Sequence, residues 1–342
     1  MTSHPFEELR IPLRHLELAA KAWGHRDDAP LLALHGWLDN AGSFDRLAPL
    51  LQGRRVIALD LAGHGRSDHR APGSWYPYVD YLDEIAAAID WLGGAPVDLL
   101  GHSLGATLAS LFAALSPDKV RRLLLIEGLG PLTLPAQRTL EQWRRAHLAR
   151  QAFRGDGLRI FPDIDSATEA RRRSGHLSLE AARCIVERGV RAVEAGGRAG
   201  LEAGGGEGAS GGGPERAKGS DGSFGFGVGK TKSSDGSFGV GSEKAFPAIC
   251  WSSDPRLTLP SPTRLTEEQL AAILPGIEAS TLLVLAEPEA PYLPRASMDV
   301  RIALVRDIEV IRIAGTHHLH LEDPLPVAAA INAFLQRDSS SA

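Results

Sequence analysis

The sequence has few of the features that mark secreted or membrane proteins. Only two cysteines, Cys184 and Cys250, occur among 342 residues, which is too few for a disulfide framework and consistent with a reducing compartment. No run of about 18 apolar residues is present, which excludes a membrane-spanning helix. The N-terminal residues form neither a basic segment nor an apolar one, so no secretory signal is predicted. We therefore expect a soluble, cytoplasmic protein.

A large excess of charge of one sign is also missing. Lys and Arg total 37, Asp and Glu total 42, and the formal net charge is −5. This weak acidic excess gives no electrostatic reason to expect a nucleic acid or an anionic membrane as a partner. Apolar residues make up 43% and charged residues 23%, as in an ordinary globular protein, which argues against disorder of the whole chain. The length fits two domains, or one α/β domain with an insertion.

One segment differs from the rest in its glycine content. Residues 196–242 contain nearly half of the 37 glycines and a repeated Ser-Asp-Gly-Ser-Phe-Gly sequence, at 220–225 and 234–239. Few large apolar side chains accompany these glycines, so little burial would offset the backbone entropy lost on ordering them. We expect this segment to be a flexible, low-complexity insert.

The rest of the chain alternates between short aliphatic runs and helical patterns. Such runs are typical of buried parallel strands, and here they occupy residues 31–34, 56–59, 97–100, 123–126, 281–285 and 310–313. Apolar residues recur at helical spacing over 104–115 and 326–336, and residues 131–195 also have a helical pattern. The alternation predicts an α/β fold with a mostly parallel central sheet flanked by helices, interrupted after the fourth of these runs by a helical segment.

The strongest functional signal is the sequence Gly101-His102-Ser103-Leu104-Gly105. It follows a predicted strand and opens a predicted helix, which is the setting of a G-x-S-x-G nucleophile elbow. Glycines are expected at both ends of the motif because a strained strand-to-helix turn brings neighbouring backbones into contact. The turn would expose the Ser103 hydroxyl above the N-terminus of the helix, where developing negative charge is favoured. Ser103 is therefore the predicted nucleophile.

Acyl transfer on a serine also needs two N–H donors that bind the oxyanion of the tetrahedral intermediate. One donor is expected to be the amide of Leu104, directly after Ser103. The other is expected on the loop His35-Gly36-Trp37, which follows the run at 31–34, with the amide of Trp37 as the donor. A packing role for the side chains of His35 and Trp37 is compatible with this function, because the donor is a backbone group.

A histidine-rich loop follows the last predicted strand and contains His317, His318 and His320. A serine nucleophile needs a general base within hydrogen-bond reach. His317 comes first after the strand, at the sheet edge to which Ser103 would point, so it is the predicted base, with His318 as the alternative. A metal site is a rival interpretation of this cluster. However, no HExxH helix accompanies it, and the elbow accounts for one of the histidines, so we predict neither a metal nor a cofactor.

Together these motifs resemble those of the α/β-hydrolase superfamily. The loop at 60–68, DLAGHGRSD, adds a fourth motif, and all four appear in the family's order. The resemblance covers about residues 11–130 and 280–335, and the chain looks similar to lid-bearing serine hydrolase-like proteins related to haloalkane dehalogenases and epoxide hydrolases. It implies an α/β-hydrolase core at 1–130 and 276–342, and a helical lid at 131–275 that contains the glycine-rich insert.

The resemblance also directs the search for the triad acid, which lies between serine and histidine in the family's order. Its usual place, after the run at 281–285, falls on Ala290, with Glu287 and Glu289 nearby. Dehalogenase-like members can instead take a glutamate after the strand that follows the elbow, and this chain has Glu127 there. That strand would end at the same sheet edge as Ser103, and an imidazolium would offset the desolvation of a buried carboxylate. Glu127 is therefore the predicted acid, with Glu287 or Glu289 as the alternatives.

Departures from these neighbouring families narrow the expected chemistry. Ser103 stands where dehalogenases and epoxide hydrolases carry an aspartate, and Leu104 stands where dehalogenases usually carry a halide-binding tryptophan. The resemblance therefore implies an acyl-serine mechanism with a Ser103–Glu127–His317 triad acting on a small-molecule carboxylic ester. Cleavage of a thioester, an amide or a C–C bond is an alternative. A non-catalytic binding protein of the same fold is another, because the family's usual acid position is occupied by Ala290.

Overall fold

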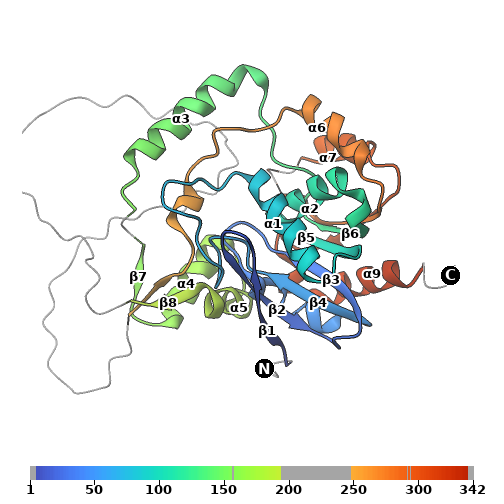
Figure 1. The fold of residues 1–342 in the computed structure, drawn as a ribbon, viewed down its shortest axis with the longest axis horizontal. Helices are drawn as coiled ribbons and strands as arrows, with labels where there is room; N and C mark the ends of the chain where they lie inside the picture. The colour runs from blue at the N-terminus through green and yellow to red at the C-terminus, as the bar shows by residue number, and fades with distance from the viewer. Residues whose placement is uncertain (1–4, 156–157, 194–247, 291, 293, 338–342) are drawn as a thin grey trace, which may run out of the picture.

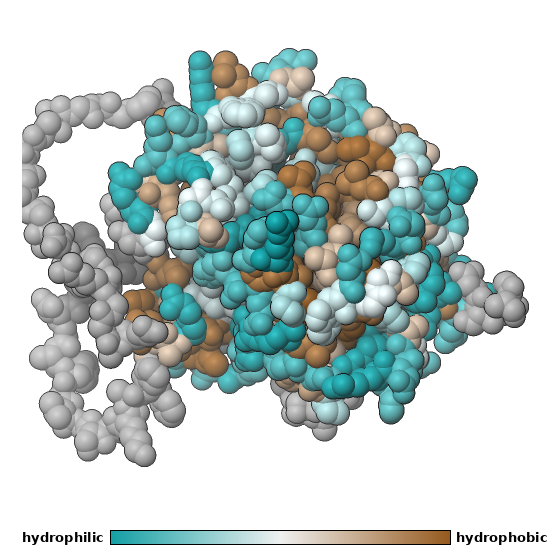
Figure 2. Space-filling view, viewed as in Figure 1, coloured by the Kyte–Doolittle hydropathy of each residue, from teal (hydrophilic) through white to brown (hydrophobic). Residues whose placement is uncertain are grey.

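The computed structural model describes residues 5–155, 158–193, 248–290, 292 and 294–337 (Figure 1). The predicted glycine-rich insert at 196–242 lies outside the described residues. In the part of the chain that is described, no helix is both long enough and apolar enough to span a bilayer. Figure 2 shows that hydrophilic residues cover much of the visible face, with smaller hydrophobic patches between them.

Within the described residues, the central sheet has eight strands in the order β1-β2-β4-β3-β5-β6-β10-β11. The strands β1 (Glu7–Pro12), β2 (Glu17–Trp23) and β4 (Arg54–Leu59) pair antiparallel. From β4 onward each strand pairs in parallel with the next one in this order. These strands are β3 (Ala29–Leu34), β5 (Val97–His102), β6 (Val120–Ile126), β10 (Ser280–Glu287) and β11 (Ile308–Ala314). All six predicted aliphatic runs lie in the parallel strands, which confirms the mostly parallel sheet. The strands β1 and β2 are not predicted from the sequence, because β1 is a largely exposed edge strand and β2 is made of small and mixed residues, Glu-Leu-Ala-Ala-Lys-Ala-Trp, rather than of an aliphatic run.

Successive residues of the parallel strands face two different hydrophobic layers. Leu123 and Leu125 of β6 join the layer that contains α1 (Tyr78–Trp91) and α2 (Leu104–Leu115). Leu124 and Ile126 join the opposite layer, which contains α9 (Pro324–Gln336). Because side chains alternate along a strand, both faces of the inner parallel strands are buried, which explains their largely aliphatic sequences, whereas the edge strand β11 is only partly buried. The helix expected at 326–336 is α9, and Figure 1 shows it on the far side of the sheet from α1.

The segment between β6 and β10 contains both helices and short strands. Its elements are α3 (Thr139–Ala152), β7 (Ile160–Phe161), α4 (Ile164–Gly175), α5 (Leu179–Gly189), β8 (Val190–Ala192), β9 (Ile249–Trp251), the 3-10 helix η5 (Pro255–Thr258) and α6 (Glu267–Ile273). The short strands form a second, antiparallel sheet in the order β7-β9-β8, which the helical pattern does not predict. Figure 1 shows α3 arching away from the central sheet, while α4 and α5 lie close to it.

The two chain ends that flank residues 194–247 meet in this small sheet. The amide of Val193 donates to the carbonyl of Ala248 at 2.7 Å, directly beyond the paired strands β8 and β9. An insertion at such a point leaves the pairing of both strands intact. The free-energy cost of closing a longer loop there grows only slowly with its length.

Candidate active site

Ser103 occupies a strained turn between β5 and α2. Its φ is 53° and its ψ is −109°, a conformation that residues with a Cβ rarely adopt. A Cβ at position 101 would collide with the carbonyl group of Gly105, and a Cβ at position 105 would collide with the carbonyl group of Leu34. Both glycines of the motif are therefore required by the close approach of three backbones. The turn places Ser103 at the N-terminus of α2, where backbone N–H groups lack helical partners.

The two predicted oxyanion donors lie on segments that touch. Leu104 is the first residue of α2, and the next amide along, that of Gly105, donates to the carbonyl of His35 at 3.0 Å. This bond holds the start of α2 against the loop that follows β3, and Trp37 is on that loop. The indole Nε1 of Trp37 donates to the carbonyl of Leu257 at 3.0 Å, so its side chain is bound to η5 of the inserted segment. Trp37 and Leu104 therefore lie on two segments that are hydrogen-bonded to each other, one of which contains Ser103.

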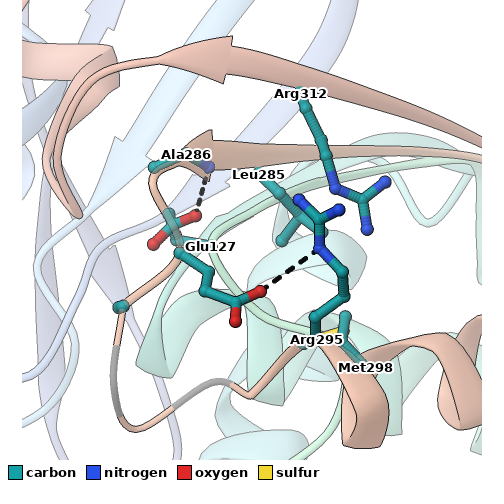
Figure 3. Close-up of a pocket in the computed structure, with 8 residues that line it drawn as sticks. Glu127, Leu285, Ala286, Arg295, Met298 and Arg312 are labelled. Atoms are coloured by element: carbon teal, nitrogen blue, oxygen red, sulfur yellow. Dashed lines mark hydrogen bonds and ion pairs between the residues drawn. The ribbon is translucent and has the colours of Figure 1, made fainter.

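His317 and Glu127 are hydrogen-bonded to each other across the end of the sheet. Their Nδ1 and Oε2 atoms are 3.1 Å apart, although the residues are separated by 190 positions in the sequence. Glu127 is only 3% exposed, and its second oxygen, Oε1, accepts the amide of Ala286 at 2.6 Å (Figure 3). Because an ionised carboxylate only accepts, the pair places the proton of a neutral His317 on Nδ1 and leaves Nε2 as the basic nitrogen.

Glu127 reaches this position through an unusual backbone conformation directly after β6. Its φ is 56°, and its amide donates to the carbonyl of Val284 on β10 at 2.9 Å. On the other side of β6, the amide of Ser103 donates to the carbonyl of Ile126 at 3.0 Å. The nucleophile elbow and the carboxylate therefore emerge from adjacent strands at the same edge of the sheet.

The serine and the histidine are close in the fold but are not yet hydrogen-bonded. Nε2 of His102, the residue before Ser103, lies 2.9 Å from the carbonyl oxygen of His317, and the two imidazole rings are 4.8 Å apart. Among the described residues, no hydrogen bond joins the Ser103 hydroxyl to His317. Such bonds are often long without substrate and shorten in the reacting complex.

The alternative acids lie elsewhere. The side chains of Glu287 and Glu289 are 58% and 49% exposed, and both face Arg295, at 3.3 and 3.4 Å. Neither has a hydrogen bond to His317 among the described residues. Ala290, at the family's usual acid position, lines a small pocket together with Glu127. Neither Ser103 nor His317 lines that pocket, so it flanks the acid rather than the nucleophile.

The other histidines of the loop have partners other than a glutamate. His318 Nε2 lies 3.4 Å from a carboxylate oxygen of Asp39, and His320 Nε2 lies 2.8 Å from the hydroxyl of Ser43. Burial is the main cause that lowers the pKa of both imidazoles, that of His320 to about 3. His317 is thus the one histidine of this loop that meets a glutamate. In the described part of the chain, no group of three or more His, Cys, Asp or Glu side chains is arranged to hold a metal ion.

Comparisons with known proteins agree with this fold. Residues 29–174 match the family profile described as "alpha/beta hydrolase fold". The chain is 25% identical to a "Serine hydrolase-like protein" of Danio rerio, over 97% of this chain and 89% of that protein. It is 43% identical to a pimeloyl-[acyl-carrier protein] methyl ester esterase of Neisseria meningitidis, over 29% of this chain and 36% of that enzyme.

A solved structure extends the likeness to the whole chain. The hypothetical protein of Pseudomonas aeruginosa PAO1 is 35% identical, with a TM-score of 0.77, and the match covers 97% of this chain and 100% of that protein. The chain therefore belongs to the α/β-hydrolase superfamily, which confirms the resemblance seen in its motifs. Its serine hydrolase-like relatives mark it as a hydrolase of that fold.

Two residues at the site, Asp39 and Arg171, are not predicted from the sequence. Asp39, on the same loop as Trp37, is buried against His318, and Arg171 of the inserted helix α4 forms an ion pair with it. The sequence signal for Asp39 is weak: an acidic residue shortly after a buried strand, close to Gly36. Nothing in the sequence pattern around Arg171 distinguishes it from the other arginines of α4, because its partner lies 132 positions away.

Proposed function

We propose that this chain is a serine hydrolase that cleaves a carboxylic ester through an acyl-serine intermediate. The observation that carries the proposal is the hydrogen-bonded pair of Glu127 and His317, 3.1 Å apart, at the sheet edge where Ser103 occupies a strained turn. A buried glutamate that orients an imidazole beside a serine is the arrangement that activates a serine for attack on a carbonyl.

In the proposed reaction, the Ser103 oxygen attacks the ester carbonyl while His317 Nε2 takes the hydroxyl proton. The negative oxygen of the tetrahedral intermediate binds the amides of Leu104 and Trp37. His317 then gives its proton to the departing alkoxide, which leaves as an alcohol. In the second half of the reaction, His317 takes a proton from water as the water oxygen attacks the acyl group. His317 then returns that proton to the Ser103 oxygen, which leaves as the free hydroxyl while the carboxylic acid is released. Glu127 holds the Nδ1–H and stabilises the imidazolium formed in both halves.

The ester class is supported by the match to the methyl ester esterase, since the chemistry of that protein is the hydrolysis of an acyl ester. We propose a small-molecule substrate rather than a macromolecular partner, in line with the near-even charge of the chain. We also propose a cytoplasmic location, because both cysteines, Cys184 and Cys250, are free thiols.

The test is labelling with a fluorophosphonate probe, followed by intact-mass measurement. Such a probe phosphonylates a serine only where the hydroxyl is activated and the oxyanion is stabilised. We expect one adduct on the wild-type protein and on Ser74→Ala, an exposed control, and none on Ser103→Ala. Adducts on all three proteins, or on none of them while they are folded, would contradict the proposal.

Two observations favour a second candidate, a non-catalytic binding protein of the same fold. The Ser103 hydroxyl and His317 are not hydrogen-bonded among the described residues, and Ala290 replaces the family's usual acid. The same labelling experiment separates the two candidates, because a binding protein without an activated serine would stay unlabelled. If labelling succeeds, a panel of short-chain methyl esters, thioesters and amides would establish the bond that is cleaved.

A further inference from the structure

Asp39 lies at a point where four parts of the active site meet. It is 1% exposed and follows β3, two positions after Trp37. One of its oxygens accepts from Arg171 of α4, and the other lies 3.4 Å from His318 Nε2 and 3.9 Å from His102 Nδ1. A single carboxylate therefore contacts the inserted segment, the base loop and the nucleophile elbow, and it belongs to the oxyanion loop itself.

A buried carboxylate in this position needs a permanent positive charge. Burial opposes the ionisation of Asp39, but the charge of Arg171 and the hydrogen bond from His318 outweigh it and hold the pKa of Asp39 well below its ordinary value. Arg171 is itself only 7% exposed. The two charges thus depend on each other, and separating them would leave one of them buried without compensation.

Two links lead from Asp39 to the backbone that carries His317. The first passes through His318, the next residue in the chain. The second passes through His102, whose Nε2 lies 2.9 Å from the carbonyl oxygen of His317 and donates to it. Gly36 makes this second link possible, because a Cβ there would lie 3.0 Å from His102 Nδ1 and 3.1 Å from the Asp39 carboxylate.

His102 shows that this arrangement has an energetic cost. When its Nε2–H donates to the carbonyl of His317, a neutral imidazole has only a lone pair on Nδ1, and that lone pair faces the Asp39 carboxylate. Among the described residues, Nδ1 of His102 has no hydrogen-bond partner. Burial, and then the neighbouring imidazoles of His320, His317 and His318, lower the pKa of His102 well below its ordinary value, so it stays neutral. A buried polar atom left in this state calls for an explanation beyond packing.

We propose that Asp39 and Arg171 are positioning residues, whose ion pair transmits the placement of the inserted helix α4 to the loop that holds His317. The inference rests on the proposed function, because it assigns His317 as the base. With Arg171 in place, the charge of Asp39 is compensated and the carboxylate holds His318, the residue that directly follows the base in the chain. When α4 moves away, Asp39 becomes an uncompensated anion near the imidazoles, and the base is both less well placed and more readily protonated.

A positioning role for Asp39 and Arg171, unlike a merely structural role, predicts that their substitution shifts the pH dependence of kcat/KM. The groups that face His317 are Glu127, His102, His318 and Tyr292, and those that face Asp39 are Arg171, His318 and His102. His320 adds a further imidazole behind His102. Among these groups, Arg171 and Asp39 are the charged residues that have no direct contact with the Glu127–His317 pair. Their substitution therefore changes the charge near His317 without altering that pair itself.

The two single substitutions should therefore shift the acidic limb of the pH profile of kcat/KM in opposite directions. Arg171→Met leaves the Asp39 anion, favours a protonated base and should shift the limb to higher pH by about one unit. Asp39→Asn leaves the Arg171 cation and should shift the limb to lower pH by a similar amount. The double variant removes both charges and should bring the limb back toward the wild-type position.

Two further variants serve as controls. Arg171→Lys keeps the charge and should leave the limb in place, although the placement of the base becomes looser. Arg173→Met removes an arginine on the same helix whose side chain is 74% exposed and paired with Glu169, and it should change nothing. Equal losses of kcat at every pH, with no shift of the limb in either single variant, would overturn the proposal.

A second measurement is independent of turnover. Amide hydrogen exchange of the peptide covering residues 315–322 should accelerate at least tenfold in Arg171→Met and stay unchanged in Arg173→Met. Unchanged exchange in both variants would overturn the link between α4 and the base loop. If the wild-type protein failed to react with the fluorophosphonate probe but the exchange result held, the proposed hydrolase activity would fall while this positioning link would stand.

Discussion

Replacing Glu127 with glutamine tests the active site most directly, because the contacts of this residue predict two separate losses. The first is electrostatic. The carboxylate lies 3.1 Å from His317 Nδ1 and is 3% exposed. A unit charge pair at about 4 Å contributes about 4 kcal/mol at a protein-like dielectric constant, which corresponds to a rate factor of about 10³ when the imidazolium forms in the transition state.

The second loss follows from the amide of Ala286. This amide donates to Glu127 Oε1 at 2.6 Å, so the carbonyl oxygen of a glutamine would turn toward it. The NH₂ group would then face His317 Nδ1, which would have to accept a hydrogen bond and so carry no proton. That tautomer places the proton on Nε2, where the imidazole can no longer take the Ser103 proton.

We therefore expect kcat to fall by about 10³ or more in Glu127→Gln, with little change in KM, because the interaction is made in the transition state rather than with bound substrate. The assay is steady-state hydrolysis of whichever activated ester the wild-type protein cleaves, with thermal unfolding to verify that the variant is folded. Glu287→Gln, on an exposed side chain, is the matched control and should retain wild-type kcat. A kcat for Glu127→Gln within tenfold of the wild type would refute the assignment of the acid.

Three further predictions concern stability. Gly105→Ala should destabilise the fold by about 3 kcal/mol or more, since its Cβ meets backbone, whereas Gly53→Ala, with open space around it, should cost only about 1 kcal/mol; denaturant unfolding measures both. Replacing residues 194–247 with a short turn should keep the fold and stabilise it by about 2 kcal/mol in the same assay, because the flanking strands already pair. Acid should destabilise the protein: burial lowers the pKa of His320 to about 3, below its value in the unfolded chain, so stability is lost as the pH falls below about 6.5, by about 2 kcal/mol at pH 5 from this residue. His320→Gln should reduce that acid sensitivity, while His147→Gln, on an exposed residue, should not. The first prediction would be contradicted if Gly53→Ala lost as much stability at neutral pH as Gly105→Ala. The second would be contradicted if the shortened chain failed to fold, and the third if His320→Gln kept the wild-type pH dependence of stability.

Short-range patterns in the sequence determine much of the framework. Short aliphatic runs predict the parallel strands because both faces of such strands are buried, and this burial holds for five of the six runs. The run at 310–313 lies in the edge strand β11, which is only partly buried. The elbow at Ser103 is equally local: its two glycines, the preceding strand and the following helix all lie within a few residues of one another. Trp37 and His317 are likewise predicted from their places shortly after strands, because the carboxyl ends of parallel strands share one edge of the sheet, and Leu104 is predicted from its place directly after Ser103.

The choice among chemically equivalent residues depended on the tertiary structure. Three glutamates were candidates for the acid, and only the pairing of β6 beside β10 and the left-handed backbone at Glu127 bring one of them to His317. The ion pair of Asp39 and Arg171 joins residues 132 positions apart, and no local pattern encodes a contact of that range. The sequence alone therefore determines which kinds of side chain line the site, because motifs and periodicity act over a few residues. Which carboxylate meets which histidine is decided only when distant segments pack, because burial and charge pairing act between neighbours in space.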